Sequence, residues 1–231
     1  MMHSFKNSLL YSIILIFVGS SIYFTLNMLV AVDPLRVTTQ NAGILPWAFH
    51  DNTVWIMVGK EYRHRAGWVW TDFGGKCDTN KKTCKRETIA ECAGREGSEE
   101  IRELYKPTVF AQKITENPIV ITNNYAQCFP EIEWIPQEDL NALSQKKIGT
   151  YKEKVAFKWI KARELLRAVA EAQKSSANPW FYHVYIGDSR RYDNTTEQSN
   201  LLYWNLAKTL GMPKVQSIIK KLLEREKHDR T

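Results

Sequence analysis

The first part of this sequence lacks charge. Residues 7–32 contain no charged side chain, and residues 9–32 are almost wholly apolar. That length meets the roughly 20 residues that a helix needs to cross a bilayer. No polar face interrupts the run, which argues against a buried core helix. A weak cleavage site for a signal peptide stands at residues 18–20, but a second apolar run follows it. We therefore expect residues 1–35 to form an uncleaved N-terminal transmembrane anchor.

Cysteine is also scarce. The four cysteines form no CxxC pair and no zinc-ligand spacing with the five histidines. The simplest interpretation is therefore reduced thiols in a reducing compartment. Cys77 and Cys84 lie in one loop and could pair if the domain faced an oxidising space.

Length and net charge limit the number of domains and the kinds of partner only broadly. A chain of 231 residues suits one domain with extensions. The net charge of +7 favours encounters with polyphosphate, nucleic acid or anionic lipid, but it does not determine the fold.

An acidic cluster organises the middle of the chain. Glu96, Glu99 and Glu100 are spaced so that a helix places them on one face. Like charges at this spacing lower helix stability by roughly a few tenths of a kcal/mol per pair, unless a positive charge offsets them. Mg²⁺ takes oxygen ligands and is held by a few carboxylates together with substrate phosphates. The alternative is a solvated helix face, which is where charge runs ordinarily lie.

The surroundings of this cluster carry a family resemblance. Glu87 is followed after seven residues by Arg95-Glu96-Gly97-Ser98-Glu99-Glu100. This pattern resembles the box of the Nudix hydrolases. The segments at residues 70–76 and 131–140 resemble further parts of that family, and together the matches cover roughly residues 42–170.

The box departs from the family pattern at three places. Lys81 stands where a glycine is usual, Gly97 replaces an aliphatic residue, and Arg102-Glu103 replaces a closing Gly-aliphatic pair. A glycine within a helix costs roughly 1 kcal/mol relative to alanine. The box helix is expected from about Thr88, and without the closing glycine it could run on through Leu104.

The resemblance implies a fold and a chemistry. It implies an α/β domain at residues 36–175, with a mixed sheet between helices, that hydrolyses a diphosphate linkage in a nucleoside diphosphate derivative. Glu96, Glu99 and Glu100 would be the catalytic residues and would hold Mg²⁺ or Mn²⁺. The other site residues it implies are Glu87 and Arg95 as orienting groups, Gly74 and Gly75 as structural residues, and Glu131 or Glu133 as a further ligand. Glu131 and Glu133 are explained equally well by an exposed sheet face.

Two other functions remain open. The altered loop and glycines are compatible with a Nudix-fold module that binds a nucleotide or a partner without cleaving it. The basic charge leaves RNA cap hydrolysis as a further alternative, with salt-sensitive binding to nucleic acid.

The orientation of the anchor is a near tie, since Lys6 precedes the span and Arg36 follows it. The α-amino group favours an inside N-terminus, which would put the domain outside. Nucleotide substrates and unpaired cysteines favour the cytosol. We expect the domain at the cytosolic face of a membrane.

The remaining segments give coarser expectations. Residues 59–67 are charged and bounded by glycines, which predicts a hairpin loop. Arg63 and Arg65 in this loop could steer a phosphate chain or belong to a solvated turn. Residues 152–174 have the apolar spacing of an amphipathic helix.

Residues 176–231 form a C-terminal extension that is expected to be mainly helical, with helices at 201–210 and 215–226. Its aromatic residues, among them Tyr203 and Trp204, could stack on a base, but packing against the domain is the favoured interpretation.

Overall fold

A computed structural model of the chain describes residues 37–122, 124–146, 153–176, 183–186 and 199–228. Internal contacts divide the chain into two compact units, Met1–Asp33 and Pro34–Thr231, and all the described residues belong to the second. Within the described ranges, no helix is both long and apolar enough to cross a membrane. The predicted anchor at residues 1–35 lies outside these ranges and stays a prediction.

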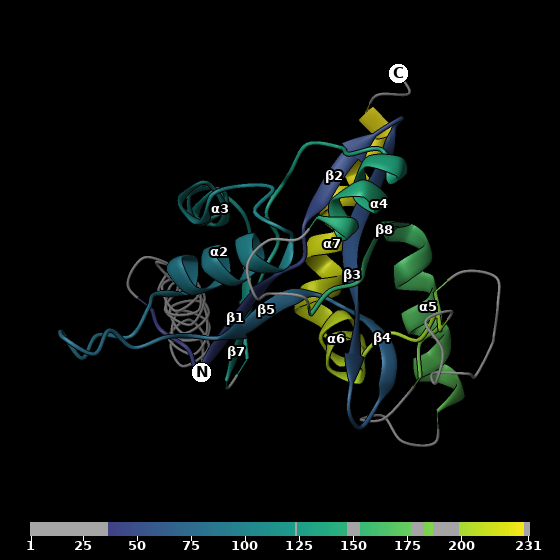
Figure 1. Cartoon of the computed structure of the whole chain (residues 1–231). Coiled ribbons are helices and arrows are strands. Elements are labelled where there is room, and N and C mark those ends of the chain that lie inside the picture. Colours follow the sequence, from purple (N-terminus) through teal and green to yellow (C-terminus); the bar gives the residue numbers. More distant parts are fainter. Residues whose placement is uncertain (1–36, 123, 147–152, 177–182, 187–198, 229–231) are drawn as a thin grey trace, which may run out of the picture. The chain divides into compact units, whose positions relative to one another are not determined.

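Two four-stranded sheets form the framework of the second unit (Figure 1). In the first sheet, of order β5-β1-β7-β6, β1 is antiparallel to β5 and parallel to β7. In the second sheet, the long strand β3 pairs with β2 and β4 along one edge and with β8 along the other. The strands are β1 (Asn41–Ile44), β2 (Trp47–His50), β3 (Thr53–Arg63), β4 (Gly67–Thr71), β5 (Phe73–Lys76), β6 (Ile119–Ile121), β7 (Tyr125–Cys128) and β8 (Ala156–Lys161).

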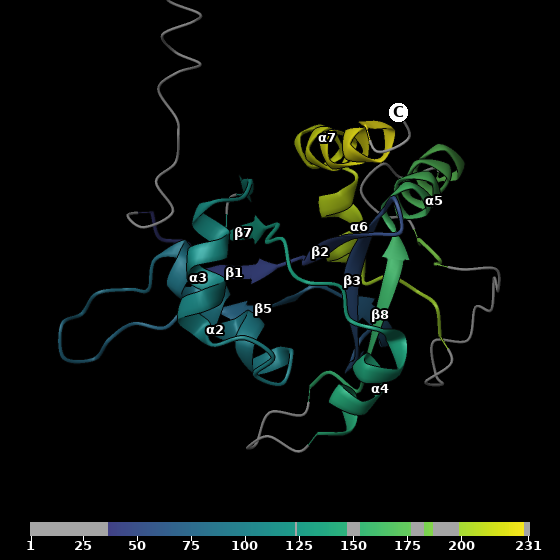
Figure 2. The same ribbon diagram turned by 90° about the horizontal axis from the view of Figure 1, so that it is seen from above.

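Helices cover each sheet separately. In both ribbon views, α2 and α3 lie together beside the first sheet, whereas α5, α6 and α7 lie on the side of the second (Figures 1 and 2). The helices are α2 (Ile89–Glu100), α3 (Pro107–Thr115), α4 (Gln137–Gln145), α5 (Ala162–Ser175), α6 (Trp204–Leu210) and α7 (Pro213–His228). The predicted mixed α/β class is confirmed, and so are the two helices expected near the C-terminus.

Strand β3 contributes to two hydrophobic cores. Ile56 and Val58 pack into a core shared with α5, α6 and α7, and Met57 between them belongs to the core under α2 and α3. Because successive side chains of a strand point to opposite faces, both faces of β3 are buried. This explains why residues 54–58 read as an almost continuous apolar run.

The helix predicted over residues 152–174 was wrong in its first half. Residues 156–161 form β8, which pairs along β3 from Trp55 to Lys60, and the helix begins only at Ala162. Phe157 and Trp159 pack into the core under α2, whereas Ile160 packs into the other. Pairing with a central strand that is buried on both faces overrides the helical spacing of these residues.

The hairpin loop predicted at residues 59–67 is much shorter than expected. Strand β3 runs to Arg63 and β4 starts at Gly67, so Lys60 and Glu61 lie in the buried part of the sheet. Lys60 donates from Nζ to the Ser199 carbonyl at 2.8 Å and lies 4.9 Å from the ring centre of Trp70. Buried charges are tolerated where they are paired in this way.

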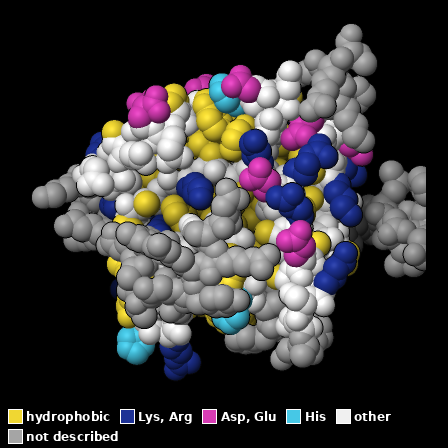
Figure 3. Space-filling view, turned by 90° about the vertical axis from the view of Figure 1, so that its right-hand side faces the viewer, with side chains coloured by type: hydrophobic (Ala, Val, Ile, Leu, Met, Phe, Trp, Pro, Cys, Tyr) yellow, Lys and Arg dark blue, Asp and Glu magenta, His cyan; other side chains and the backbone are white. Residues whose placement is uncertain are grey.

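The surface on the side of α5 and β8 mixes both charges. Lysine and arginine side chains gather over one part of this face, with acidic side chains among them (Figure 3). The exposed positions of α5 include Arg163, Glu164, Arg167, Glu171 and Lys174. The excess of positive charge is therefore interspersed with acids on this face.

Candidate active site

The candidate site is built on α2, whose start is fixed by its first turn. Thr88 caps the helix, accepting at Oγ1 from the Glu91 amide at 3.3 Å, while Glu91 accepts from the Thr88 amide at 2.9 Å. This reciprocal capping box fixes the start of the helix. From this start, Ile89, Cys92 and Ala93 point into the core, as expected from the sequence.

Glycines let the helix and the sheet approach closely. A Cβ atom on Gly97 would lie 2.4 Å from Ile44 Cδ1, so the glycine in the box allows α2 to settle on β1. On β5, a Cβ atom on Gly75 would lie 2.5 Å from Glu96 Oε2. The Glu96 carboxylate therefore occupies the space that any other residue at position 75 would fill.

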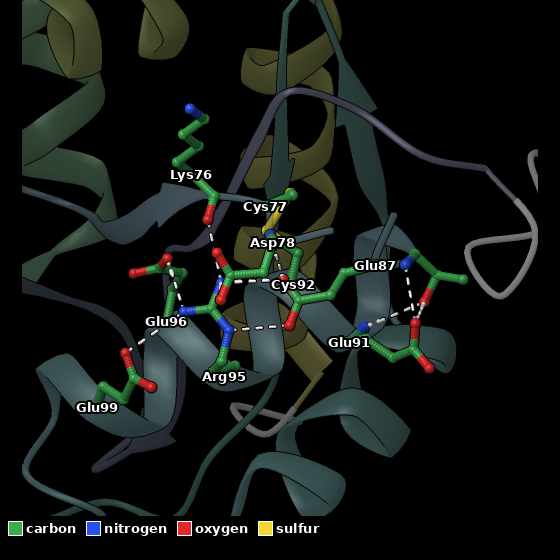
Figure 4. Close-up of polar contacts among 10 residues, drawn as sticks. Lys76, Cys77, Asp78, Glu87, Glu91, Cys92, Arg95, Glu96 and Glu99 are labelled. Atoms are coloured by element: carbon green, nitrogen blue, oxygen red, sulfur yellow. Dashed lines mark hydrogen bonds and ion pairs between the residues drawn. A yellow bond between two sulfur atoms is a disulfide. The ribbon is translucent and has the colours of Figure 1, made fainter. Parts of the chain in front are cut away.

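Arg95 joins several acids into one network (Figure 4). Its Nε and Nη2 each donate to the Glu87 carboxylate at 2.9 Å, and Nη1 donates to Glu96 at 2.9 Å and to Glu99 at 3.4 Å. Nη2 also donates to the Lys76 carbonyl at 3.0 Å. A two-pronged arginine–carboxylate pair fixes geometry as well as charge. The arginine thus holds the loop before α2 and two carboxylates of α2 in one arrangement.

A disulfide fastens the same region. Cys77, which follows β5, is bonded to Cys92 on α2, while Cys84 is free and exposed and Cys128 is free and buried. The predictions of reduced thiols and of a Cys77–Cys84 pair were wrong, because the fold places Cys77 over α2 while Cys84 stays in the exposed loop. Disulfides persist in oxidising compartments. The cysteines therefore no longer support a cytosolic domain, and localisation stays a prediction.

We expect Cys77→Ser to lower the free energy of unfolding by about 3 kcal/mol, the value for a crosslink across some 15 residues. The two cysteines are 15 residues apart. Urea unfolding with and without reductant measures the effect, and Cys84→Ser in the same loop is the matched control. Equal stability of Cys77→Ser and the unreduced chain would show that no such crosslink forms.

Glu100, the last residue of α2, lies in a buried ionic cluster. Glu100 accepts from the Gly74 amide at 2.7 Å and lies 3.4 Å from Lys154 Nζ. Lys154 Nζ is also 2.7 Å from Glu61 Oε2, and the Lys154 side chain is 0% exposed. Carboxylate oxygens of Glu61, Glu100 and the exposed Glu153 lie within 4.8 Å of one another.

The end of α2 differs from the prediction. The helix stops at Glu100 and does not continue to Leu104, because Arg102 and Glu103 adopt φ angles of 55° and 56°. Arg102 is buried and donates from Nη2 to the Lys154 carbonyl at 2.7 Å. This contact connects the end of α2 to the segment before β8, from which Glu153 and Lys154 reach the acids.

Burial and hydrogen bonding shift the pKa values of the acids in opposite directions. Burial raises the pKa of Glu100 to about 8, although Lys154 opposes the shift. Burial also raises the pKa of Glu96 and of Glu99, against the lowering effect of Arg95. At Glu87, hydrogen bonds from Arg95 and the Asp78 amide outweigh burial and lower the pKa. Glu96, Glu99 and Glu100 therefore lack full compensation for their negative charge, whereas Glu87 is already compensated by Arg95.

Cavities flank this cluster. A small cavity of about 40 Å³ is lined by Glu96, Glu99, Glu100, Arg102, Glu153 and Lys154. A larger cavity of about 940 Å³ borders Glu87 and Arg95, whose polar groups are already bound to each other. A third, of about 900 Å³, is bordered by Gly74 and Arg63. The structure thus brings Glu96, Glu99 and Glu100 together around the small cavity.

The other predicted site residues differ in where they lie. Arg63 lines the third cavity and is paired with Glu61, whereas Arg65 is exposed in the hairpin turn. Glu131 is bound to Arg225 of α7 at 3.0 Å, and the exposed Glu133 is bonded through its amide to the Tyr105 hydroxyl. Neither Glu131 nor Glu133 lines the small cavity, so the structure does not support them as further ligands.

Sequence reasoning missed Glu61 and Glu153, the acids whose carboxylates lie near Glu100. Glu61 lay inside a presumed hairpin loop, and Glu153 and Lys154 lay inside a presumed helix. Glu61 stands beside Lys60 in a charged stretch that follows the apolar run of residues 54–58, so no local signal placed it in the strand.

Comparison with known proteins gives matches among solved structures. No protein-family model and no curated protein matches the chain. The solved structures that match include a putative Nudix hydrolase from Listeria monocytogenes (14% identity, TM-score 0.38, covering 83% of this chain and 97% of that one). They also include the Nudix domain of Shewanella oneidensis NrtR complexed with ADP ribose (13% identity, TM-score 0.34, covering 61% of this chain and 83% of that one). A third is a Caenorhabditis elegans Ap4A hydrolase binary complex (11% identity, TM-score 0.34, covering 56% of this chain and 85% of that one). Nudix proteins, the family that the box resembles, are thus among the matches, but at these identities and TM-scores they assign no activity.

Proposed function

We propose that this chain is a divalent-metal-dependent hydrolase that cleaves a diphosphate linkage in a nucleoside diphosphate derivative. The observation that supports it is the convergence of Glu96, Glu99 and Glu100 on one small cavity, where Glu153 joins them. Every acidic donor at this cavity is a carboxylate oxygen, the ligand type that Mg²⁺ and Mn²⁺ prefer. The donor set therefore fits such an ion, with Glu96, Glu99 and Glu100 as its proposed ligands.

When bound, the ion would neutralise and polarise the phosphoryl oxygens of the substrate. The chain's own residues prepare that site. Arg95 holds Glu96 and Glu99, and the Gly74 amide holds Glu100. Since phosphoryl transfer depends mainly on positioning and charge neutralisation, this fixed arrangement of carboxylates is the main contribution of the protein.

The experiment is a screen of the purified full chain against nucleoside diphosphate sugars, dinucleotides, dinucleoside polyphosphates and nucleoside triphosphates, with Mg²⁺ or Mn²⁺. We expect metal-dependent release of a nucleoside monophosphate or of pyrophosphate from at least one class. No release from any class at any metal concentration would overturn the proposal.

A module that binds without hydrolysis remains the second candidate. Lys154 favours it, because its ammonium group already lies against Glu61 and Glu100 and supplies a positive charge there. Calorimetry with the same compounds separates the two functions, since the module would bind one of them saturably and release no product.

Metal binding should depend on pH. Glu100, with its pKa raised to about 8, must lose a proton before it binds a cation. Between pH 6 and 8 we expect the Mn²⁺ affinity to rise about tenfold per pH unit and then to level off, since one proton is displaced. Titration followed by electron paramagnetic resonance at pH 6, 7, 8 and 9 measures this slope. The same slope in Glu100→Gln would assign it to another group, and an affinity independent of pH would contradict the prediction.

A further inference from the structure

The cavity of about 900 Å³ lies between the first sheet and α6. Its floor includes Asn41, Tyr125 and Gln127, and α6 contributes Trp204, Leu206 and Lys208. Ile44 on β1 lies against Gly97 of α2, and successive side chains of a strand point to opposite faces. Asn41, three residues before Ile44, therefore points away from α2, and it pairs in register with Tyr125. The cavity is therefore on the face of the sheet opposite to the box helix.

This cavity lies next to the carboxylate cluster. Gly74 lines it and donates its amide to Glu100 at 2.7 Å. Arg63 also lines it and is ion-paired with Glu61, which in turn binds Lys154. A ligand in the cavity thus has a guanidinium group and the edge of the acidic cluster at one end.

Aromatic rings stand at the α6 side of the cavity. The Trp204 residue is 39% exposed although it is large and apolar. The Tyr203 ring centre is 5.7 Å from that of Trp204 and 5.4 Å from Arg63 Cζ. Exposed aromatic faces next to a cation are the surfaces on which nucleic-acid bases stack.

The cavity also offers a fixed hydrogen-bond acceptor. Asp72 accepts from the Thr71 hydroxyl at 2.9 Å and from the Tyr125 hydroxyl, and it lines the cavity. The Gln127 side-chain amide nitrogen also donates to Asp72, at 2.9 Å. A carboxylate has about four acceptor positions, so Asp72 retains one for an N–H donor of a ligand. Aromatic rings and an acceptor that line the same cavity suit a planar ring that carries N–H groups, and a nucleobase has both properties.

We propose that α6 of the C-terminal extension forms the base-binding wall of the substrate site, with Trp204 stacking on the nucleobase and Arg63 contacting the adjoining phosphate. This rests on the proposed function for the identity of the ligand as a nucleotide. It assigns the recognition of the base to α6, while α2 supplies the carboxylates.

The test is calorimetric titration of the full chain with AMP, GMP, CMP and UMP in the presence of Mg²⁺, with ribose 5-phosphate as the base-free probe. For at least one nucleotide we expect binding more than about tenfold tighter than that of ribose 5-phosphate. Trp204→Ala should weaken nucleotide binding about five- to 150-fold, the range that corresponds to about 1–3 kcal/mol of stacking. Trp204→Phe should restore most of it, and ribose 5-phosphate binding should stay unchanged.

Tyr62→Ala is the matched control, because Tyr62 is an aromatic residue with 57% exposure that does not line the cavity. Circular dichroism of each variant checks that it is folded. Equal nucleotide affinity of Trp204→Ala and the unaltered chain would overturn this inference, whether or not the chain hydrolyses a diphosphate. Absence of hydrolysis together with Trp204-dependent binding would overturn the proposed activity and leave the base-binding wall in place.

Discussion

Replacing Glu100 by glutamine is expected to reduce turnover about 10³-fold or more, equivalent to about 4 kcal/mol of transition-state stabilisation. Glu100 lines the small carboxylate cavity, and its carboxylate lies within 4.8 Å of those of Glu61 and Glu153. The substitution removes a negative ligand oxygen, and ligands of this kind hold the ion that stabilises phosphoryl charge. Turnover of the substrate found in the screen, at saturating Mg²⁺, measures the effect.

The fold should survive this change. A glutamine side-chain oxygen can still accept from the Gly74 amide, and Lys154 keeps Glu61 as its partner. Glu131→Gln makes the same chemical change at an acid bound to Arg225 on α7, and should leave turnover unchanged. Unaltered turnover in Glu100→Gln would show that the site has been assigned to the wrong residues.

Replacing Lys154 by methionine is expected to lower the free energy of unfolding by about 3–5 kcal/mol, the cost of breaking a buried ion pair by removing one partner. The Lys154 side chain is 0% exposed and the Glu61 side chain is 3% exposed. Without the ammonium group, the buried Glu61 and Glu100 have lost the cation that offsets their ionisation. Chemical unfolding in the absence of metal measures the loss.

Two features distinguish this electrostatic loss from poor packing. The unpaired carboxylates would have raised pKa values in the folded state, so the loss should be small at pH 4, where the unfolded chain is also protonated, and should grow as the pH rises. Mg²⁺ or Mn²⁺ should restore part of the stability, because Glu61, Glu100 and Glu153 can supply oxygens to one ion. Lys158→Met, on β8 beside the Trp70 ring, is the matched control. A loss independent of both pH and metal would contradict this interpretation of Lys154.

Local features of the box were predictable from the sequence. The spacing of Glu96, Glu99 and Glu100 and the capping residues before them act within a few helical turns, so the helix and its acidic face follow from short-range geometry. The reason for Gly97 was not local. Within the helix, a glycine only lowers stability. Its function is to leave space for Ile44 of β1, more than fifty residues earlier in the chain.

The deeper half of the cluster depends on long-range pairing. Glu61 and Lys154 are separated by 93 residues and meet near the point where β8 pairs with β3. The spacing of apolar residues over 152–174 fits a helix, and only the open edge of β3 decides that its first part is a strand. The cysteine pair was missed for a similar reason, since α2 folds back onto the end of β5.

A divalent-cation site formed by Glu96, Glu99 and Glu100 is tested most directly by Mn²⁺ titration of the full chain at pH 8. The titration is followed by electron paramagnetic resonance, for the unaltered protein, Glu100→Gln and Glu131→Gln. We predict saturable Mn²⁺ binding that Glu131→Gln leaves unchanged and Glu100→Gln weakens at least about tenfold, the equivalent of about 1.4 kcal/mol. Equal Mn²⁺ affinity in all three proteins, or no saturable binding in the unaltered protein, would contradict the claim.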